Sequence, residues 1–217
     1  MGKWSYWIKS GFFHSLYILL ASFFYGIFVA IVSNNFTLHE IAVTTYEYAN
    51  IMGSIMLVIL NVTKIPFITN TILSFGETRK NCVKGITLMN DTTIIVNAFV
   101  STLFGLLAYR NIIVLFNTLI MLPSVNLLAN GLGLLICSIK KTLSTTADGL
   151  KTLLMILAVP FVYVLSFITT IPLDETNEYK NAFIQILIIF NLILGLILTI
   201  AGTCLFKKRV MQLEVKL

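Results

Sequence analysis

Six long tracts without charged side chains constrain this chain more than any other feature of its sequence. A helix needs about 20 apolar residues to cross a hydrocarbon core of about 30 Å, so each tract is long enough for one crossing. The tracts are 15–33, 50–70, 92–109, 112–138, 152–171 and 183–206, and Lys64 is the one formal charge inside them. The sequence therefore predicts an all-α membrane protein whose six transmembrane helices form a single domain over 1–217.

The overall composition excludes a water-soluble globule of this size. Hydrophobic residues make up 58% of the chain and charged residues 11%, whereas an ordinary soluble domain has about 45–50% and about 25%. The formal net charge of +6 does not indicate a nucleic-acid partner, because the basic residues gather in short loops between apolar tracts. The expected surroundings of the chain are the lipid bilayer.

Basic residues divide unequally between the two sides of the predicted bundle. With the N-terminus inside, the inner loops and termini hold twelve Lys and Arg residues, and the outer loops hold only Arg110 and Lys180. The inner residues are Lys3, Lys9, Arg79, Lys80, Lys84, Lys140, Lys141, Lys151, Lys207, Lys208, Arg209 and Lys216. Because short cytoplasmic loops retain positive charge, we expect both termini to be cytoplasmic.

The segment before the first crossing, 1–14, has an amphipathic pattern. Trp4, Trp7 and Ile8 share one helical face, while Lys3 and Lys9 fall elsewhere. This pattern predicts an interfacial helix along the inner leaflet, with the indoles at headgroup depth. A cleaved signal peptide is the alternative, although the uncharged run of 19 residues that follows is longer than the usual hydrophobic region of about 7–15 residues.

The sequence lacks the residue patterns of catalytic and metal sites. His14 and His39 are the only histidines, and the predicted topology puts them at opposite membrane faces. No nucleophile elbow, zinc-protease motif or phosphate-binding loop occurs in the chain. We therefore expect neither enzymatic activity nor a metal or cofactor site in this chain.

Two charged residues near the ends of crossings have competing interpretations. Lys64 either extends towards the cytoplasmic interface or a main-chain carbonyl group, or it takes part in translocation, since a charge within a crossing is costly. Asp91, directly before the third tract, is expected to be a helix N-cap.

The fourth tract is the longest and the richest in asparagine. It holds Asn117, Asn126 and Asn130 around Pro123, which favours a tilted, kinked or broken helix. Asparagines in membranes commonly hydrogen-bond between helices, which is the simplest interpretation of each one alone. If one helix of the chain lines a transport pathway, we expect it to be this one. Lys64 of the second tract is a further candidate for that pathway.

The loop after the second tract contains a helix start signal. Ser74 followed by Glu77 forms the pattern of a capping box, which predicts a short cytoplasmic helix over 75–84. This helix would present Arg79, Lys80 and Lys84 to the cytoplasm. A simpler interpretation of the same charges is an orientation signal between two crossings.

The stretch SFGETRKN in this loop resembles the Ser-Phe-Gly-x-Thr-Arg-Lys stretch of small permease subunits in the type-2 ABC exporter family. In that family the loop forms a coupling helix that docks on a separate ATPase subunit. The resemblance implies this role for Phe75, Gly76, Glu77, Thr78, Arg79 and Lys80. It further implies a bacterial plasma membrane location, a second permease copy or paralogue, and ATP and Mg²⁺ bound by the partner ATPase.

The chain departs from larger family members in the outer segment before its last crossing. Only 172–181 is available there, where larger members have a long helical segment, and this favours a compact exporter of peptides or of antimicrobial, amphipathic compounds. Two other functions stay open at this point. One is a membrane-embedded immunity protein that protects its host from a bacteriocin. The other is a secondary transporter, which is disfavoured because no tract carries a carboxylate at its middle.

Overall fold

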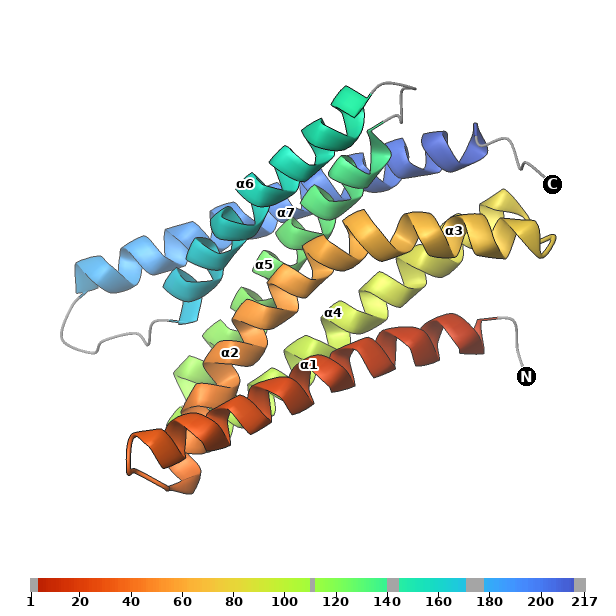
Figure 1. The fold of residues 1–217 in the computed structure, drawn as a ribbon. Helices are drawn as coiled ribbons and strands as arrows, with labels where there is room; N and C mark the ends of the chain where they lie inside the picture. Colours follow the sequence, from red (N-terminus) through yellow and green to blue (C-terminus); the bar gives the residue numbers. More distant parts are fainter. Residues whose placement is uncertain (1–3, 110–111, 140–144, 171–177, 213–217) are drawn as a thin grey trace.

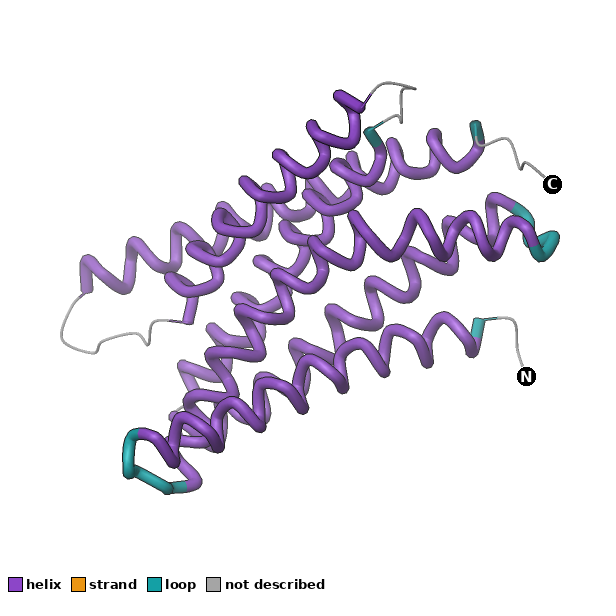
Figure 2. Tube along the Cα trace, viewed as in Figure 1, coloured by secondary structure: helices purple, strands orange, loops and turns teal. Residues whose placement is uncertain are grey.

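The computed structural model is a bundle of long helices packed side by side (Figure 1), and it describes residues 4–109, 112–139, 145–170 and 178–212. Short loops and turns join the helices, and no strand occurs within these residues (Figure 2). The elements are α1 (Ser5–Val32), α2 (Leu38–Ile59), the π-helical turn η1 (Leu60–Lys64), α3 (Ile65–Ser74), α4 (Arg79–Tyr109), α5 (Ile112–Ser138), α6 (Thr145–Thr170) and α7 (Glu178–Met211).

Five helical segments of the described residues are long and apolar enough to cross a membrane. They are Ser5–Val32, Leu38–Ser74, Arg79–Tyr109, Gly149–Ile168 and Ala182–Met211, and α5 adds the shorter apolar helix Pro123–Ser138. The expectation of an all-α chain with membrane-length helices is confirmed, and the sixth crossing stays a prediction. The helices also begin earlier than the uncharged tracts do, so Glu47, placed in an outer loop by the sequence, lies half-buried within α2.

A separate interfacial helix over 1–14 is wrong for the residues that the structure describes. α1 runs from Ser5 to Val32 without a break. Trp7 is 6% exposed, and a Cβ atom on Gly85 of α4 would lie 2.1 Å from its ring. Because Gly85 has no side chain, it leaves room for the indole of Trp7, which packs on protein.

The closest helix pair is α5 with α7, and small residues bring the two backbones together. A Cβ atom on Gly131 would lie 2.5 Å from the main-chain carbon of Leu198. On α7, a Cβ atom on Gly195 would lie 2.9 Å from the main-chain oxygen of Ser124. Small residues at helix interfaces allow such approach in membranes, where van der Waals packing drives association. α5 also packs against α2, α4 and α6, so it is the central helix of the bundle.

The start of α1 and the end of α7 lie at the same end of the bundle as the α3–α4 turn (Figure 1). The loop between α1 and α2, residues 33–37, lies at the opposite end. Lys80 and Lys84 of α4 and Lys207 and Lys208 of α7 therefore share one end of the bundle, and all four are exposed. This is the end that the sequence analysis expects to be cytoplasmic.

Candidate functional site

The α3–α4 turn is built as a helix C-terminus, so the predicted capping box at Ser74 and Glu77 is wrong. Ser74 is the last residue of α3, and its hydroxyl group donates to the carbonyl oxygen of Thr71 at 2.6 Å. Gly76 follows with φ +82°, in the left-handed region that glycine enters most easily. Its N–H donates to Leu73 at 3.1 Å, and the N–H of Glu77 donates to Ile72 at 3.4 Å. These two bonds form a Schellman motif, which ends a helix at this point.

The start signal of the next helix lies four residues further along, at Thr78. The Thr78 hydroxyl oxygen accepts from the N–H of Asn81 at 3.4 Å, and the Thr78 carbonyl oxygen accepts from the N–H of Cys82 at 2.9 Å. The Asn81 amide also donates to Glu77 at 2.8 Å. α4 then continues from Arg79 to Tyr109 without a break. The predicted short helix 75–84 is therefore not a separate element, and its second half is the first part of α4.

The six predicted coupling residues lie together at the tip of this helical hairpin, but they face different ways. Phe75 is 85% exposed, and Gly76, Thr78 and Lys80 are also exposed. A Cβ atom on Gly76 would meet nothing within 4 Å. Glu77 and Arg79 are half-buried, and Arg79 donates from Nη1 to the carbonyl oxygen of Met211 at 3.1 Å. The exposed surface of the tip is thus an aromatic ring with a lysine near it.

A hydrophobic core beneath the tip holds the hairpin against its neighbours. Leu73 of α3 and Val83 and Ile86 of α4 belong to one buried cluster with Trp7 of α1 and Phe206 of α7. Arg209 of α7 adds a polar connection, since its Nη1 donates to the carbonyl oxygen of Cys137 at 2.6 Å and also to that of Ile139. Residues of five helices, α1, α3, α4, α5 and α7, therefore pack beneath a turn on which Phe75 is exposed.

Three asparagines from three helices form a buried hydrogen-bonded group at the bundle interior, which we call the asparagine triad: Asn61, Asn90 and Asn130. Asn61 donates from Nδ2 to Oδ1 of Asn130 at 3.0 Å. Asn90 donates from Nδ2 to Oδ1 of Asn61 at 2.9 Å and to Oδ1 of Asn130 at 2.8 Å. All three side chains are at most 3% exposed.

The predicted pathway residues of α5 divide into two groups. Asn126 and Asn130 face the interior, where Asn126 accepts from the Ser54 hydroxyl group at 2.9 Å. Pro123 lies inside α5 and is half-buried, whereas the side chain of Asn117 lies outside the described residues. The helix is not broken at Pro123. Hydrogen bonding between helices accounts for Asn126 and Asn130, and their role in a pathway stays a prediction.

The polar interior continues beyond the triad. Asn50 and Asn97 are fully buried, and neither side-chain amide has a hydrogen-bond partner among the described residues. The amide of Asn97 lies against Gly53, where a Cβ atom would be 2.1 Å from its nitrogen. Buried polar atoms without partners carry a free-energy cost, and Asn50 and Asn97 bring such amides to a polar seam between α2 and α4.

Sequence reasoning missed the part of this seam that α4 contributes. Asn90 lies outside the third tract, 92–109, and the cap expected at the adjacent Asp91 is wrong, because Asp91 lies half-buried well inside α4. Asn90, Asn97 and Ser101 are spaced seven and then four residues apart, so they share one helical face. That spacing was the available signal, and it becomes visible only when the helix is extended back to Arg79.

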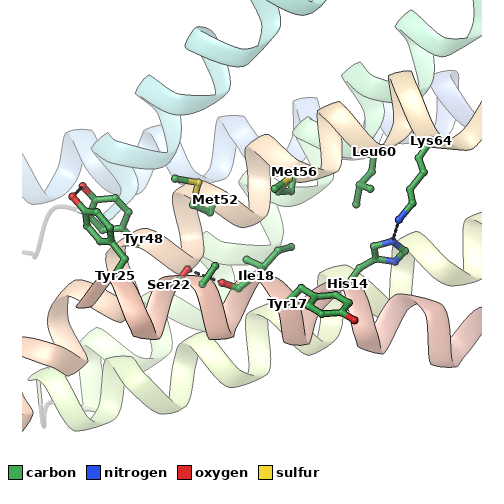
Figure 3. Close-up of a pocket in the computed structure, with 11 residues that line it drawn as sticks. His14, Tyr17, Ile18, Ser22, Tyr25, Tyr48, Met52, Met56, Leu60 and Lys64 are labelled. Atoms are coloured by element: carbon green, nitrogen blue, oxygen red, sulfur yellow. Dashed lines mark hydrogen bonds between the residues drawn. The ribbon is translucent and has the colours of Figure 1, made fainter. Parts of the chain in front are cut away.

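Lys64 lies in the π-helical turn between α2 and α3. Pro66 has no N–H and its ring crowds the preceding turn, which accounts for the wider π turn here. The Lys64 ammonium group lies 3.1 Å from Nε2 of His14 on α1. The lysine therefore contacts an imidazole and not a main-chain carbonyl group, and the two residues line a cavity between α1 and α2 (Figure 3).

The described residues contain no group of three His, Cys, Asp or Glu side chains that could hold a metal ion. Comparisons with protein-family models, curated proteins and solved structures found no match.

Proposed function

We propose that this chain is the permease subunit of an ATP-binding cassette exporter in a bacterial plasma membrane, with both termini cytoplasmic. The observation that carries the proposal is Phe75, an aromatic ring 85% exposed on a turn supported by a core from five helices. An apolar ring placed in water at the end of a rigid hairpin suits a partner protein, since aromatic residues often dominate the binding energy of protein interfaces. The family resemblance of the same residues indicates that the partner is the ATPase.

The geometry also supports a mechanical role for the hairpin. Each arm of the hairpin leads to a member of the asparagine triad. Asn61 lies in η1, shortly before α3, and Asn90 lies on α4. At about 1.5 Å per residue, Asn61 lies about 20 Å along the helix from the turn. A displacement of the turn by a docked ATPase would shift both asparagines relative to Asn130 of α5, and the triad would have to exchange its hydrogen bonds.

In this proposal the chain contributes half of the transport pathway. A second copy or a paralogue supplies the other half, and the ATPase subunits bind ATP and Mg²⁺, so this chain needs no cofactor of its own. The short connection before α7 supports a compact exporter, and the substrate class we propose is peptides or antimicrobial, amphipathic compounds.

Co-purification of this chain with an ABC-type ATPase from the same cell tests the proposal. Phe75→Ala should weaken ATPase binding by about 30-fold, which corresponds to the 2 kcal/mol of a typical interface hot spot. Phe36→Ala is the matched control, because Phe36 is 66% exposed at the opposite end of the bundle. ATP hydrolysis in lipid vesicles should fall with binding.

Equal retention of the ATPase by the Phe75 and Phe36 variants would remove the coupling role. Protection of a sensitive cell from a bacteriocin by this chain alone, without any ATPase, would favour the immunity function instead.

A further inference from the structure

The cavity between α1 and α2 has a volume of about 580 Å³, within the range of about 300–1,000 Å³ that holds small ligands. Its walls are mostly apolar, formed by residues such as Ile18, Met52, Met56 and Leu60. Figure 3 shows two polar ends separated by this apolar stretch. At one end the hydroxyl groups of Tyr25 and Tyr48 lie 2.8 Å apart, and at the other Lys64 meets His14.

The cavity exists because α1 changes its packing partner along its length. Near Tyr25, a Cβ atom on Gly26 would lie 3.1 Å from the main-chain oxygen of Ile41, so α1 and α2 are in close contact there. Towards the other end, a Cβ atom on Gly11 would lie 2.5 Å from the main-chain oxygen of Met89, so α1 follows α4 instead. α1 and α2 therefore diverge (Figure 1) and leave a wedge between them.

The wide end of the wedge carries positive charge without a negative counterpart in its lining. Lys64 is exposed and His14 is half-buried, and no Asp or Glu is among the described residues that line the cavity. The lysine can only donate, so Nε2 of His14 accepts from it. Charged side chains within membrane-spanning segments usually face a partner or a cavity, and here the lysine faces this one.

The depth of this pair in the membrane indicates the kind of ligand. His14 directly precedes the uncharged run 15–33, so it lies at the boundary between apolar core and polar interface. From His14 to Tyr25 the groove follows α1 for about 16 Å at about 1.5 Å per residue. Tyr17, 69% exposed, lies beside the groove. A ligand that fits has an anionic group at the interface and an apolar chain directed into the membrane.

We propose that this groove binds an anionic lipid of the surrounding bilayer. Its phosphate group accepts from Lys64, which His14 holds at the mouth of the groove through Nε2, and one acyl chain lies along the apolar wall towards the pair of tyrosines. The proposal does not depend on docking of an ATPase, and it stands or falls separately from the proposed function.

Native mass spectrometry of the whole chain, purified in detergent and titrated with lipid, tests the proposal. The probes are phosphatidylglycerol and phosphatidylcholine with identical acyl chains. The wild-type chain should retain phosphatidylglycerol about fivefold more strongly, as expected for one lysine at a charged lipid. Lys64→Gln should reduce retention of phosphatidylglycerol to that of phosphatidylcholine. Lys84→Gln, an exposed lysine outside the groove, should leave retention unchanged.

A second variant tests how the acyl-chain contact contributes to lipid retention, separately from the contact with the charged headgroup. Met56→Trp fills the groove from a position already 42% exposed, so the chain should fold, and retention of phosphatidylglycerol should fall although Lys64 is intact. Equal retention of both lipids by the wild-type chain would overturn the proposal. Displacement of the lipid by inorganic phosphate would also overturn it, because the groove would then be a phosphate site. A dimer that forms without lipid and is lost in Met56→Trp would overturn it as well, because the groove would then be a contact between copies.

Discussion

The guanidinium group of Arg79 donates a hydrogen bond to the main-chain oxygen of Met211 at 3.1 Å, which joins the first residue of α4 to the last residue of α7. The last carbonyl groups of a helix have no partner within it, so a cation from another helix stabilises this end. Arg79 therefore contributes to holding the hairpin in place, whereas Lys80, its neighbour, is exposed.

Arg79→Gln should loosen the end of α7 without affecting insertion. Loss of a hydrogen bond from a charged donor costs about 1.5–3 kcal/mol in buried settings and less at an exposed one. Hydrogen exchange of the last turn of α7 should become faster, and Lys80→Gln should leave it unchanged. An equal effect of both variants would mean that general charge, and not the contact with Met211, matters.

Gly76→Ala should destabilise the chain by about 1–2 kcal/mol, because the left-handed conformation is costly for a residue with a Cβ atom. Gly149→Ala is a matched control, since a Cβ atom at either position meets nothing within 4 Å and only Gly76 has a positive φ. Gly149 lies in α6, so its replacement should stabilise by about 0.5–1 kcal/mol. Thermal unfolding in detergent measures both changes, and destabilisation by Gly149→Ala as well would contradict the backbone argument.

Asn90→Leu should destabilise the bundle by about 1–3 kcal/mol, because it removes the amide that donates to the buried oxygens of Asn61 and Asn130 and replaces it with an apolar side chain of the same branching. The control is Asn70→Leu, since Asn70 is exposed on α3. Unfolding curves of the two variants in the same detergent should separate clearly. If they coincide, the triad does not contribute to stability.

Gly85→Ala should displace the indole of Trp7, because the new Cβ atom would lie 2.1 Å from the ring. We expect a loss of about 1–3 kcal/mol, typical of overpacking in a filled core. Trp7→Phe combined with Gly85→Ala should recover part of this loss, since the smaller ring leaves room. A double-mutant cycle measures the coupling, and strictly additive losses would show that the two residues do not constrain one another.

Single cysteines at Phe36 and Lys80 should label from opposite sides of the membrane in a background without Cys82, Cys137 and Cys204. Phe36 is 66% exposed between α1 and α2, and is a better probe than the half-buried Glu47. We expect Phe36 to react with an impermeant maleimide from outside and Lys80 only after the membrane is opened. Labelling of both from the same side would reject the topology.

The helical character of the chain and the approximate positions of its long apolar helices follow from the uncharged tracts, because hydrophobic length is a local property. Helix ends were less accurate. The twelve residues 38–49 of α2, which include two glutamates, and the polar start of α4 at Arg79 continue helices beyond the tracts. Backbone hydrogen bonding carries a helix outside the hydrocarbon region at no cost, so charge marks where a crossing stops and not where its helix stops.

The turn and the polar interior show a different limit. Ser74 and Glu77 match the pattern of a capping box, but Gly76 lies between them. Its left-handed conformation ends α3 before a new helix can begin. The asparagine triad joins residues 29 and 40 positions apart, so only the tertiary packing brings them together. The contact between His14 and Lys64, 50 positions apart, is equally invisible in sequence.

The π-helical turn at Leu60–Lys64 has a consequence for how this chain tolerates length changes. A π turn takes up one extra residue without rotating the helix that follows. Removing one residue there would return the segment to α-helical spacing, with a kink at Pro66, and would keep α3 in the same rotational register. Adding one would rotate α3 by about 100°, since an α-helix has about 3.6 residues per turn, and would carry Phe75 to another side of the hairpin. Within this segment, deletion and insertion are therefore not equivalent: the helix already contains its one permissible insertion.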